Sequence, residues 1–170
     1  MDNKTDLRLR AKSIRKTLDI GSLSNLLIRQ MREFKPYKSA GNVMLFYPMK
    51  YEINLLGLLN DDKNFFLPSV CDEKLQVCPF KQSDRLLKSD FNVCEPCTNP
   101  VNPKNLDLVI VPALMVDRKN YRLGYGGGFY DRFLAEYPEI PTVVPIAKEL
   151  FVENLPVDKY DIKIDYVLLI

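Results

Sequence analysis

Apolar residues near the N-terminus recur every three or four positions, and this spacing predicts two successive helices. The first helix has Leu7, Ala11, Ile14 and Leu18 on one face, and Gly21 is expected to end it as the C′ residue. The second is expected to start at Ser22 as N-cap and to stop before Pro36. Its apolar positions are Leu23, Leu26, Leu27, Met31 and Phe34. The two helices form an N-terminal helical arm.

Beyond this arm the pattern changes to short continuous apolar runs that are rich in β-branched and aromatic residues. Such runs are typical of strands that are buried on both faces. They cover residues 42–47, 64–70, 106–111, 141–146 and 165–170, and residues 74–80 are a candidate for a further, antiparallel strand. Helical patterns at 53–60 and 129–137 alternate with the runs, whereas the proline-containing segment 81–105 is expected to be a surface loop.

This alternation of strands and helices predicts an α/β fold. We expect one domain over residues 1–170, built as a three-layer sandwich in which helices flank a largely parallel sheet. Ligands of such sheets bind outside the carboxyl ends of the strands. The segment that follows the 106–111 strand is expected to run as loop to a glycine-rich stretch at that edge.

The composition is that of an ordinary soluble globular protein, with 46% apolar residues and a formal net charge of +2 over 170 residues. The basic charge is concentrated at the N-terminus, where residues 1–38 contain ten Lys and Arg against four Asp and Glu. No apolar run reaches the ~20 residues of a membrane span, and the charged N-terminus does not resemble a signal peptide. We therefore expect a cytoplasmic protein that binds no membrane.

The sequence contains no histidine. This excludes Ser-His-Asp and Cys-His catalysis and removes the commonest transition-metal ligand. A catalytic metal would then be a hard cation on oxygen ligands, above all Mg²⁺. Cys94 and Cys97 form a C-x-x-C pair, but Cys71 and Cys78 lack the matching spacing of a structural zinc site, so buried reduced thiols are favoured over zinc.

The stretch RLGYGGGFYDRFL, residues 122–134, places three consecutive glycines directly before a predicted helix. Glycine lets a backbone approach a ligand closely, and the N–H groups of a first helical turn favour an anion. The stretch therefore predicts a phosphate site, to which Arg122 adds a planar cationic fork. Asp131 would repel phosphate at close range unless a cation such as Mg²⁺ lies between them.

The same residues are also compatible with other functions. Three glycines can simply form a flexible turn, with Asp131 stabilising the positive end of the helix. The dinucleotide and P-loop patterns do not match, and the kinase pattern has neither its histidine nor D-F-G. The interleaved basic, glycine and aromatic residues also resemble the RNA-recognition octamer, although that octamer lies on a strand. A non-catalytic RNA- or nucleotide-binding module is therefore the alternative.

The stretch VPALMVDRKNYRLGYGGGFYDRFL, residues 111–134, closely resembles the 5-formyltetrahydrofolate cyclo-ligase family. The likeness extends over the chain through KTDLR, YPMKYEI, FNVCEP and YDIKIDYVLL, which occur in the family's order. It implies ATP-dependent conversion of 5-formyltetrahydrofolate to 5,10-methenyltetrahydrofolate with release of ADP and phosphate. Mg²⁺ is the implied cofactor, and ATP the co-substrate. A monomer that binds these small molecules and no nucleic acid is expected.

The resemblance also assigns roles to matching positions. Those implied to bind ATP are Lys4, Arg8, Arg122, Leu123, Gly124, Tyr125, Gly126, Gly127, Gly128, Phe129 and Tyr130. Those implied to bind the folate are Tyr47, Glu52, Phe91, Tyr125, Gly126, Gly127, Gly128 and Phe129. Catalytic roles fall on Arg122, Tyr125, Gly126 and Asp131, and Mg²⁺ on Asp131 and Asp165. Phe91 stands where some members of the family have Trp, and Leu150 occupies a position often held by Gln.

Overall fold

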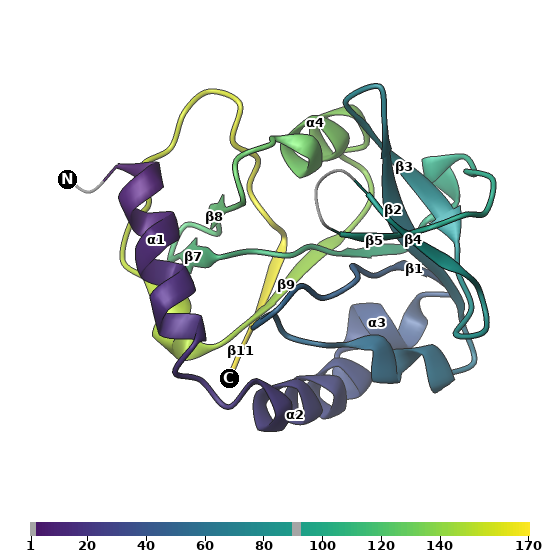
Figure 1. Cartoon of the computed structure of the whole chain (residues 1–170), viewed down its shortest axis with the longest axis horizontal. Helices are drawn as coiled ribbons and strands as arrows, with labels where there is room; N and C mark the ends of the chain where they lie inside the picture. Colours follow the sequence, from purple (N-terminus) through teal and green to yellow (C-terminus); the bar gives the residue numbers. More distant parts are fainter. Residues whose placement is uncertain (1–2, 90–92) are drawn as a thin grey trace.

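A computed structural model describes residues 3–89 and 93–170 and has a six-stranded sheet at its centre (Figure 1). The strand order is β11-β9-β6-β1-β2-β3, and all neighbours from β11 to β2 run parallel, whereas β3 is antiparallel to β2. The strands are β1 (Asn42–Met44), β2 (Asn64–Cys71), β3 (Lys74–Pro79), β6 (Leu108–Ile110), β9 (Thr142–Ile146) and β11 (Tyr166–Leu169). The predicted α/β class and the largely parallel sheet are confirmed.

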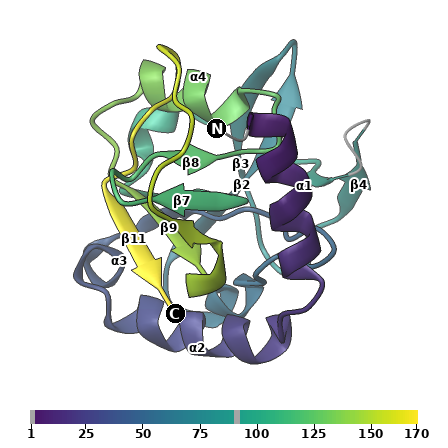
Figure 2. The same cartoon turned by 90° about the vertical axis from the view of Figure 1, so that its left-hand side faces the viewer.

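Two further layers cover the faces of this sheet (Figures 1 and 2). One contains α2 (Ile20–Glu33), α3 (Lys35–Ser39) and the 3₁₀ helix η1 (Leu56–Asn60). The other contains α1 (Lys4–Arg15), α4 (Phe129–Glu136), the 3₁₀ helix η3 (Lys148–Leu150) and a small sheet of β10 (Phe151–Val152), β7 (Met115–Asp117) and β8 (Arg122–Leu123). The three-layer arrangement was predicted correctly.

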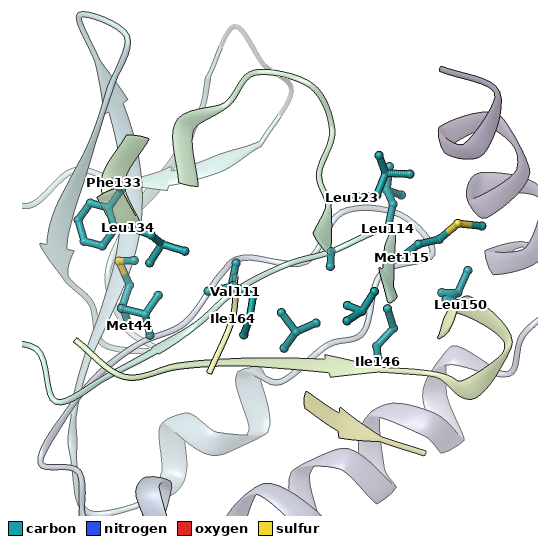
Figure 3. Close-up of a cluster of buried hydrophobic side chains, with 14 of the residues drawn as sticks. Met44, Val111, Leu114, Met115, Leu123, Phe133, Leu134, Ile146, Leu150 and Ile164 are labelled. Atoms are coloured by element: carbon teal, nitrogen blue, oxygen red, sulfur yellow. The ribbon is translucent and has the colours of Figure 1, made fainter. Parts of the chain in front are cut away.

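The period-two alternation of the strands divides the core between the two faces. Val43 and Leu45 pack with α2 and α3, whereas Met44 between them packs with the α1 and α4 layer. Leu108 and Val109 alternate in the same way. Figure 3 shows the hydrophobic cluster on the α1 and α4 side, in which side chains of the sheet meet those of α4 and of the segment before β10. Each fully buried aliphatic side chain contributes about 1.5–3 kcal/mol, so both helical layers are held by burial.

The helix ends in the N-terminal arm differ from those predicted. α1 ends at Arg15, where the Thr17 hydroxyl donates a hydrogen bond to the carbonyl of Ile14 at 2.7 Å and competes with the helical pattern. Asp19, not Ser22, is the N-cap of α2, so Gly21 lies inside that helix. Pro36 does follow α2, but it occupies the first turn of the short helix α3, where a missing N–H costs nothing.

Three expectations about the less regular parts were also wrong. Residues 81–105 contain a hairpin of β4 (Leu86–Lys88) and β5 (Cys94–Pro96) and the 3₁₀ helix η2 (Pro103–Asn105). The segment between β6 and the glycines contains the β7–β8 hairpin, which the buried Asp117 stabilises by accepting hydrogen bonds from the N–H groups of Lys119, Tyr121 and Leu155. Finally, β11 is an edge strand with Tyr166 and Leu169 exposed, so it is not buried on both faces.

Candidate active site

A cavity of about 1030 Å³ opens at the carboxyl ends of the parallel strands, where ligands of such sheets bind. The segments after β1 and β6, the last part of β2, the glycine loop with α4, the start of α1 and residues 158–162 all contribute to its wall. Among its apolar lining residues are Phe46, Pro68, Val70 and Leu75. These residues form the apolar wall of the cavity, and its charged wall consists of Lys4, Arg8, Arg122, Asp131 and Asp161. Such a lining suits a ligand with one apolar part and one anionic part.

The glycine loop turns sharply into α4 at the cavity edge. Gly126 has φ of 113° and Gly128 has φ of 66°, and L-residues rarely adopt either conformation. Gly128 is the N-cap of α4, and it has no side chain to cap the first turn. The positive end of the α4 dipole therefore faces the cavity without a side-chain acceptor from its own N-cap.

α1 brings two cations to the same wall. Lys4 and Arg8 are one helical turn apart and line the cavity, while Leu7 and Ala11 bury the neighbouring face. Arg8 Nε donates a hydrogen bond to the carbonyl of Gly124 at 2.9 Å, which ties the helix to the glycine loop. Lys4 Nζ pairs with Asp158 at 2.9 Å and with Asp161 at 2.5 Å.

Arg122 and Asp131 form an ion pair at the base of the loop, with 3.1 Å between Nη2 and Oδ2. The Arg122 side chain is almost fully buried, and its burial lowers the pKa of the guanidinium, against the opposing effect of Asp131. Within the described residues, Arg122 Nε and the Tyr130 hydroxyl are buried without hydrogen-bond partners. A polar ligand in the cavity could accept hydrogen bonds from these two donors.

A second polar network joins α1, the glycine loop and the segment after β1, and in it Arg15 and Glu52 are buried whereas Tyr125 is 39% exposed. The hydroxyl of Tyr125 donates to Glu52 Oε1 at 2.8 Å and accepts from Arg15 Nη1 at 2.6 Å. Glu52 is only 5% exposed, and its Oε2 accepts from the N–H of Met49 at 2.9 Å. Burial, followed by the nearby Glu52 charge, raises the pKa of Tyr125 above its ordinary value. The network holds the aromatic of the glycine loop against the carboxylate that follows β1.

Most of the residues proposed from the sequence meet in this cavity. Its lining includes Lys4, Arg8, Tyr47, Glu52, Arg122, Leu123, Gly124, Tyr125, Gly126, Gly127, Gly128, Phe129, Tyr130 and Asp131. Phe91 lies outside the described residues. Leu150 is packed in the hydrophobic core near Ile146 and Met115 instead of facing the cavity (Figure 3).

Asp165 is the one described candidate that the fold places elsewhere. It precedes β11, and its Oδ2 accepts hydrogen bonds from the N–H and hydroxyl of Thr142, the first residue of β9. Because β9 and β11 run parallel, this position is at the amino ends of the strands, opposite the cavity. Asp161, four residues earlier, does line the cavity. The expectation that Asp165 joins Asp131 at one metal site therefore fails on position.

The cavity contains carboxylates of the type that Mg²⁺ prefers, although the described residues hold no cluster of three or more Asp, Glu, Cys or His suited to a metal. Mg²⁺ is commonly held by one or two carboxylates together with substrate phosphates and water, so such a cluster is not required. Asp131 and Asp161 both line the charged wall. The donor set thus fits Mg²⁺ bound jointly with a phosphate ligand.

The cysteines do not form the buried set that the sequence favoured. All four are free thiols; Cys78 is buried, Cys94 is half-buried, and Cys71 and Cys97 are exposed. The burial prediction is therefore confirmed for Cys78 and wrong for Cys71 and Cys97. Their exposure follows from their positions at the end of β2 and just after β5.

The RNA-recognition interpretation also meets a structural difficulty. In that octamer the aromatics lie on a strand, whereas Phe129 and Tyr130 form the first turn of α4. Only Arg122 and Leu123 of the glycine-rich stretch are in strand conformation. The aromatic residues therefore do not present the flat stacking surface that the alternative requires.

Residues 3–169 match the 5-formyltetrahydrofolate cyclo-ligase family. The chain belongs to this family. Membership makes the protein an enzyme of the ligase class. It also agrees with the resemblance seen in the sequence and with the position of the glycine loop at the cavity.

Individual relatives give the same result. The 5-formyltetrahydrofolate cyclo-ligase of Escherichia coli is 42% identical over 151 residues, covering 82% of this chain and 83% of its own length. The mouse enzyme of the same name is 28% identical over 180 residues, covering 95% of this chain and 87% of its own length.

Within the described residues, no helix has the length and apolar character needed to cross a membrane.

Solved structures share the fold. The structure of Aquifex aeolicus 5,10-methenyltetrahydrofolate synthetase has a TM-score of 0.84 and 28% identity, covering 98% of this chain and 89% of that one. The synthetase structure from Mycoplasma pneumoniae has a TM-score of 0.73 at 20% identity, covering 99% and 98%. At that lower identity the second likeness shows the fold alone.

Asp161, which lines the cavity, and Arg15 were both missed by the sequence reasoning. Arg15 is 6% exposed and contacts both Tyr125 and Glu52. Its position, three helical turns after Lys4 on the same face of α1, was the available signal. The basic composition of the segment masked it, because charged helix residues usually lie in solvent.

Proposed function

We propose that the protein converts 5-formyltetrahydrofolate to 5,10-methenyltetrahydrofolate with ATP and Mg²⁺, releasing ADP and phosphate. The observation that carries the proposal is the meeting of three groups in one cavity: the glycine loop with α4, the cations of α1, and the Tyr47 and Glu52 wall. A phosphate site and an apolar wall that includes a buried carboxylate match the two substrates.

The chemistry needs a better leaving group on the formyl carbon. A formamide oxygen leaves poorly, so the carbon resists attack by the neighbouring N10 amine. Transfer of the γ-phosphoryl group to that oxygen gives an imidate-like phosphate. N10 then attacks the carbon and loses its proton to solvent, the C–O bond breaks, and phosphate leaves. The protein supplies alignment and charge neutralisation, and no histidine is needed.

The charged wall would hold the nucleotide phosphates. Lys4 and Arg8 provide cations from α1, and the loop from Arg122 to Tyr130 provides backbone N–H groups at the positive end of α4. Arg122 can neutralise charge that develops on the transferred phosphoryl group. Because Arg8 already bonds to Gly124, helix and loop would bind the phosphates as one unit.

Asp131 would hold Mg²⁺, with Asp161 as the second carboxylate in place of Asp165. Bound there with the phosphates, the ion supplies neutralisation of negative charge on the transferring group. Asp131 Oδ2 contacts Arg122, and its Oδ1 accepts from the N–H of Ile162 at 3.3 Å. These contacts fix the direction of the carboxylate.

The apolar wall would hold the folate. Tyr47 can pack on the pterin ring, and Glu52 can accept hydrogen bonds from pterin N–H groups because each carboxylate oxygen keeps a further acceptor site. Gly126 and Gly127 would let the formyl group approach the phosphate site closely. We further propose that residues 1–170 act as one domain and as a cytoplasmic monomer.

The test is a spectroscopic assay with purified protein, Mg²⁺, ATP and 5-formyltetrahydrofolate. We expect the near-ultraviolet absorption of the methenyl product to appear, with one ADP formed per product. Omission of ATP or addition of a chelator should abolish the signal. If no methenyl product forms although the 5-formyltetrahydrofolate and ATP are intact, the proposed function is wrong.

A further inference from the structure

Arg15 ends α1 beneath the cavity and makes three polar contacts there. Its Nη1 donates to the Tyr125 hydroxyl at 2.6 Å and lies 3.5 Å from Glu52 Oε1, and its Nη2 donates to the carbonyl of Ala113. Arginine is almost never fully buried unless it is paired. Arg15 is thus paired with two groups of the candidate site and anchored to the segment that follows β6.

The position of Arg15 relative to the cavity separates it from the other α1 cations. Lys4 and Arg8 are among the described residues that line the main cavity, and Arg15 is not. Tyr125 and Glu52 both line it. Arg15 instead lines an adjoining cavity of about 440 Å³ that shares Tyr125 with the main one, and its contacts with Tyr125 and Glu52 are the direct route by which it can act on a ligand in the main cavity.

The chemistry of the three groups fixes the direction of their hydrogen bonds. A guanidinium can only donate, and an ionised carboxylate can only accept. The Tyr125 hydroxyl must then accept from Arg15 and donate to Glu52. The order Arg15, Tyr125, Glu52 thus joins α1, the glycine loop and the segment after β1 through one tyrosine hydroxyl.

We propose that Arg15 is a positioning residue for the folate: it holds Glu52 and Tyr125 in the geometry that binds the pterin. This inference rests on the proposed function. Without Arg15, Glu52 loses its cationic partner and Tyr125 loses the donor that orients its hydroxyl. The glycine loop would stay tied to α1 through Arg8, so ATP binding is expected to change little.

The test uses the full chain and compares four variants with the wild type. The variants are Arg15→Met, Arg15→Lys, Tyr125→Phe and the Arg15→Met/Tyr125→Phe double variant. Arg10→Met is the matched control, because Arg10 is exposed on the same helix. Calorimetric titration with 5-formyltetrahydrofolate alone gives Kd without turnover, and the methenyl assay gives KM for each substrate and kcat.

For Arg15→Met we expect Kd and KM for the folate to rise at least ~10-fold, the order of one lost charged hydrogen bond, with KM for ATP and kcat within ~3-fold. Tyr125→Phe should show part of the same loss, and the double variant should lose less than the product of the two single effects. Arg15→Lys should recover part of the affinity, because it keeps the charge but not the fork. Arg10→Met should bind like the wild type.

Several results would overturn the inference. One is a folded Arg15→Met variant whose folate Kd stays within ~2-fold of the wild type, and another is full multiplicativity in the double variant. If Arg15→Met does not fold, unchanged folate binding in both Arg15→Lys and Tyr125→Phe decides against it. A wild type that binds no folate refutes the proposed function as well, whereas an active wild type with unaffected variants refutes this inference alone.

Discussion

Arg122 and Asp131 lie nine residues apart in the chain and meet at the base of the glycine loop, with 3.1 Å between Nη2 and Oδ2. The pair joins the start of β8 to the first turn of α4 and spans the glycines between them. The Asp131 carboxylate therefore has two functions. It compensates a buried guanidinium, and in the proposed reaction it also holds the divalent ion.

Replacement of that carboxylate by an amide tests the second function. Asp131→Asn keeps a hydrogen-bond acceptor for Arg122 but removes the negative charge, so we expect a folded protein with turnover reduced at least ~100-fold. Methenyl formation measured over a range of Mg²⁺ concentrations checks this. Asp165→Asn is the control: it should lower stability by about 1 kcal/mol through Thr142 and leave turnover within ~2-fold. Unchanged turnover in Asp131→Asn would remove Asp131 from the mechanism.

The contrast between Asp131 and Asp165 shows what the sequence could and could not provide. The strands, their order of alternation with helices and the glycine loop at the carboxyl edge followed from local patterns such as the 42–47 and 106–111 runs. Which end of β11 faces the cavity did not, because it depends on strand direction in the assembled sheet. Likewise, Arg15 and Tyr125 are 110 residues apart, so the helical spacing that places Arg15 on the Lys4 face cannot show that it meets Tyr125.

The unusual backbone of the glycine loop leads to a second prediction. Gly126→Ala would place a methyl group at φ of 113°, beside the Arg8 guanidinium, at a strain of about 1–3 kcal/mol. We expect KM for ATP to rise at least ~10-fold, because the backbone must move away from the phosphate site. Steady-state kinetics and thermal unfolding measure the two effects.

Gly21→Ala is the matched control for that change. Gly21 lies in the first turn of α2, and an added Cβ would meet its nearest neighbour at 3.6 Å, an ordinary contact. The substitution is expected to stabilise the protein by about 0.5 kcal/mol and to leave KM unchanged. Equal kinetics for both alanine variants would contradict a special role for the loop.

The ion pairs of Lys4 predict a pH window for stability. The hydrogen bond from Lys4 lowers the pKa of Asp158; burial lowers the pKa of Lys4, but hydrogen bonds to Asp161 and Asp158 outweigh it and raise that pKa. The contribution of Asp158 is thus present above its ordinary pKa of ~3.9 and is lost as pH falls through the lower folded value. That of Lys4 is present below ~10.4 and is lost as pH rises through its higher folded value.

Urea unfolding of the wild type and Lys4→Met checks this window. We expect the difference between their midpoints to be constant from pH ~6 to ~9 and smaller at pH ~3. Lys12→Met, an exposed change in the same helix, should follow the wild type at each pH. A difference for Lys4→Met that stays the same at pH ~3 would show that the ion pairs do not stabilise the fold.

The cysteines provide a test that does not depend on activity. Cys78 is 1% exposed, and burial raises the pKa of its thiol, against an opposing hydrogen bond with Ser69. Because the thiolate is the reactive form, alkylation at pH ~8 should modify the exposed Cys71 and Cys97 at least ~10-fold faster than Cys78. Mass spectrometry of timed samples measures the order, and unfolding in urea should make all four rates similar.

A chelator should leave the Cys97 rate unchanged, because a thiol held by zinc would be protected until the metal is removed. Rapid native modification of Cys78 would contradict the packing of β3 against β2, and chelator-dependent release of Cys97 would restore the zinc interpretation.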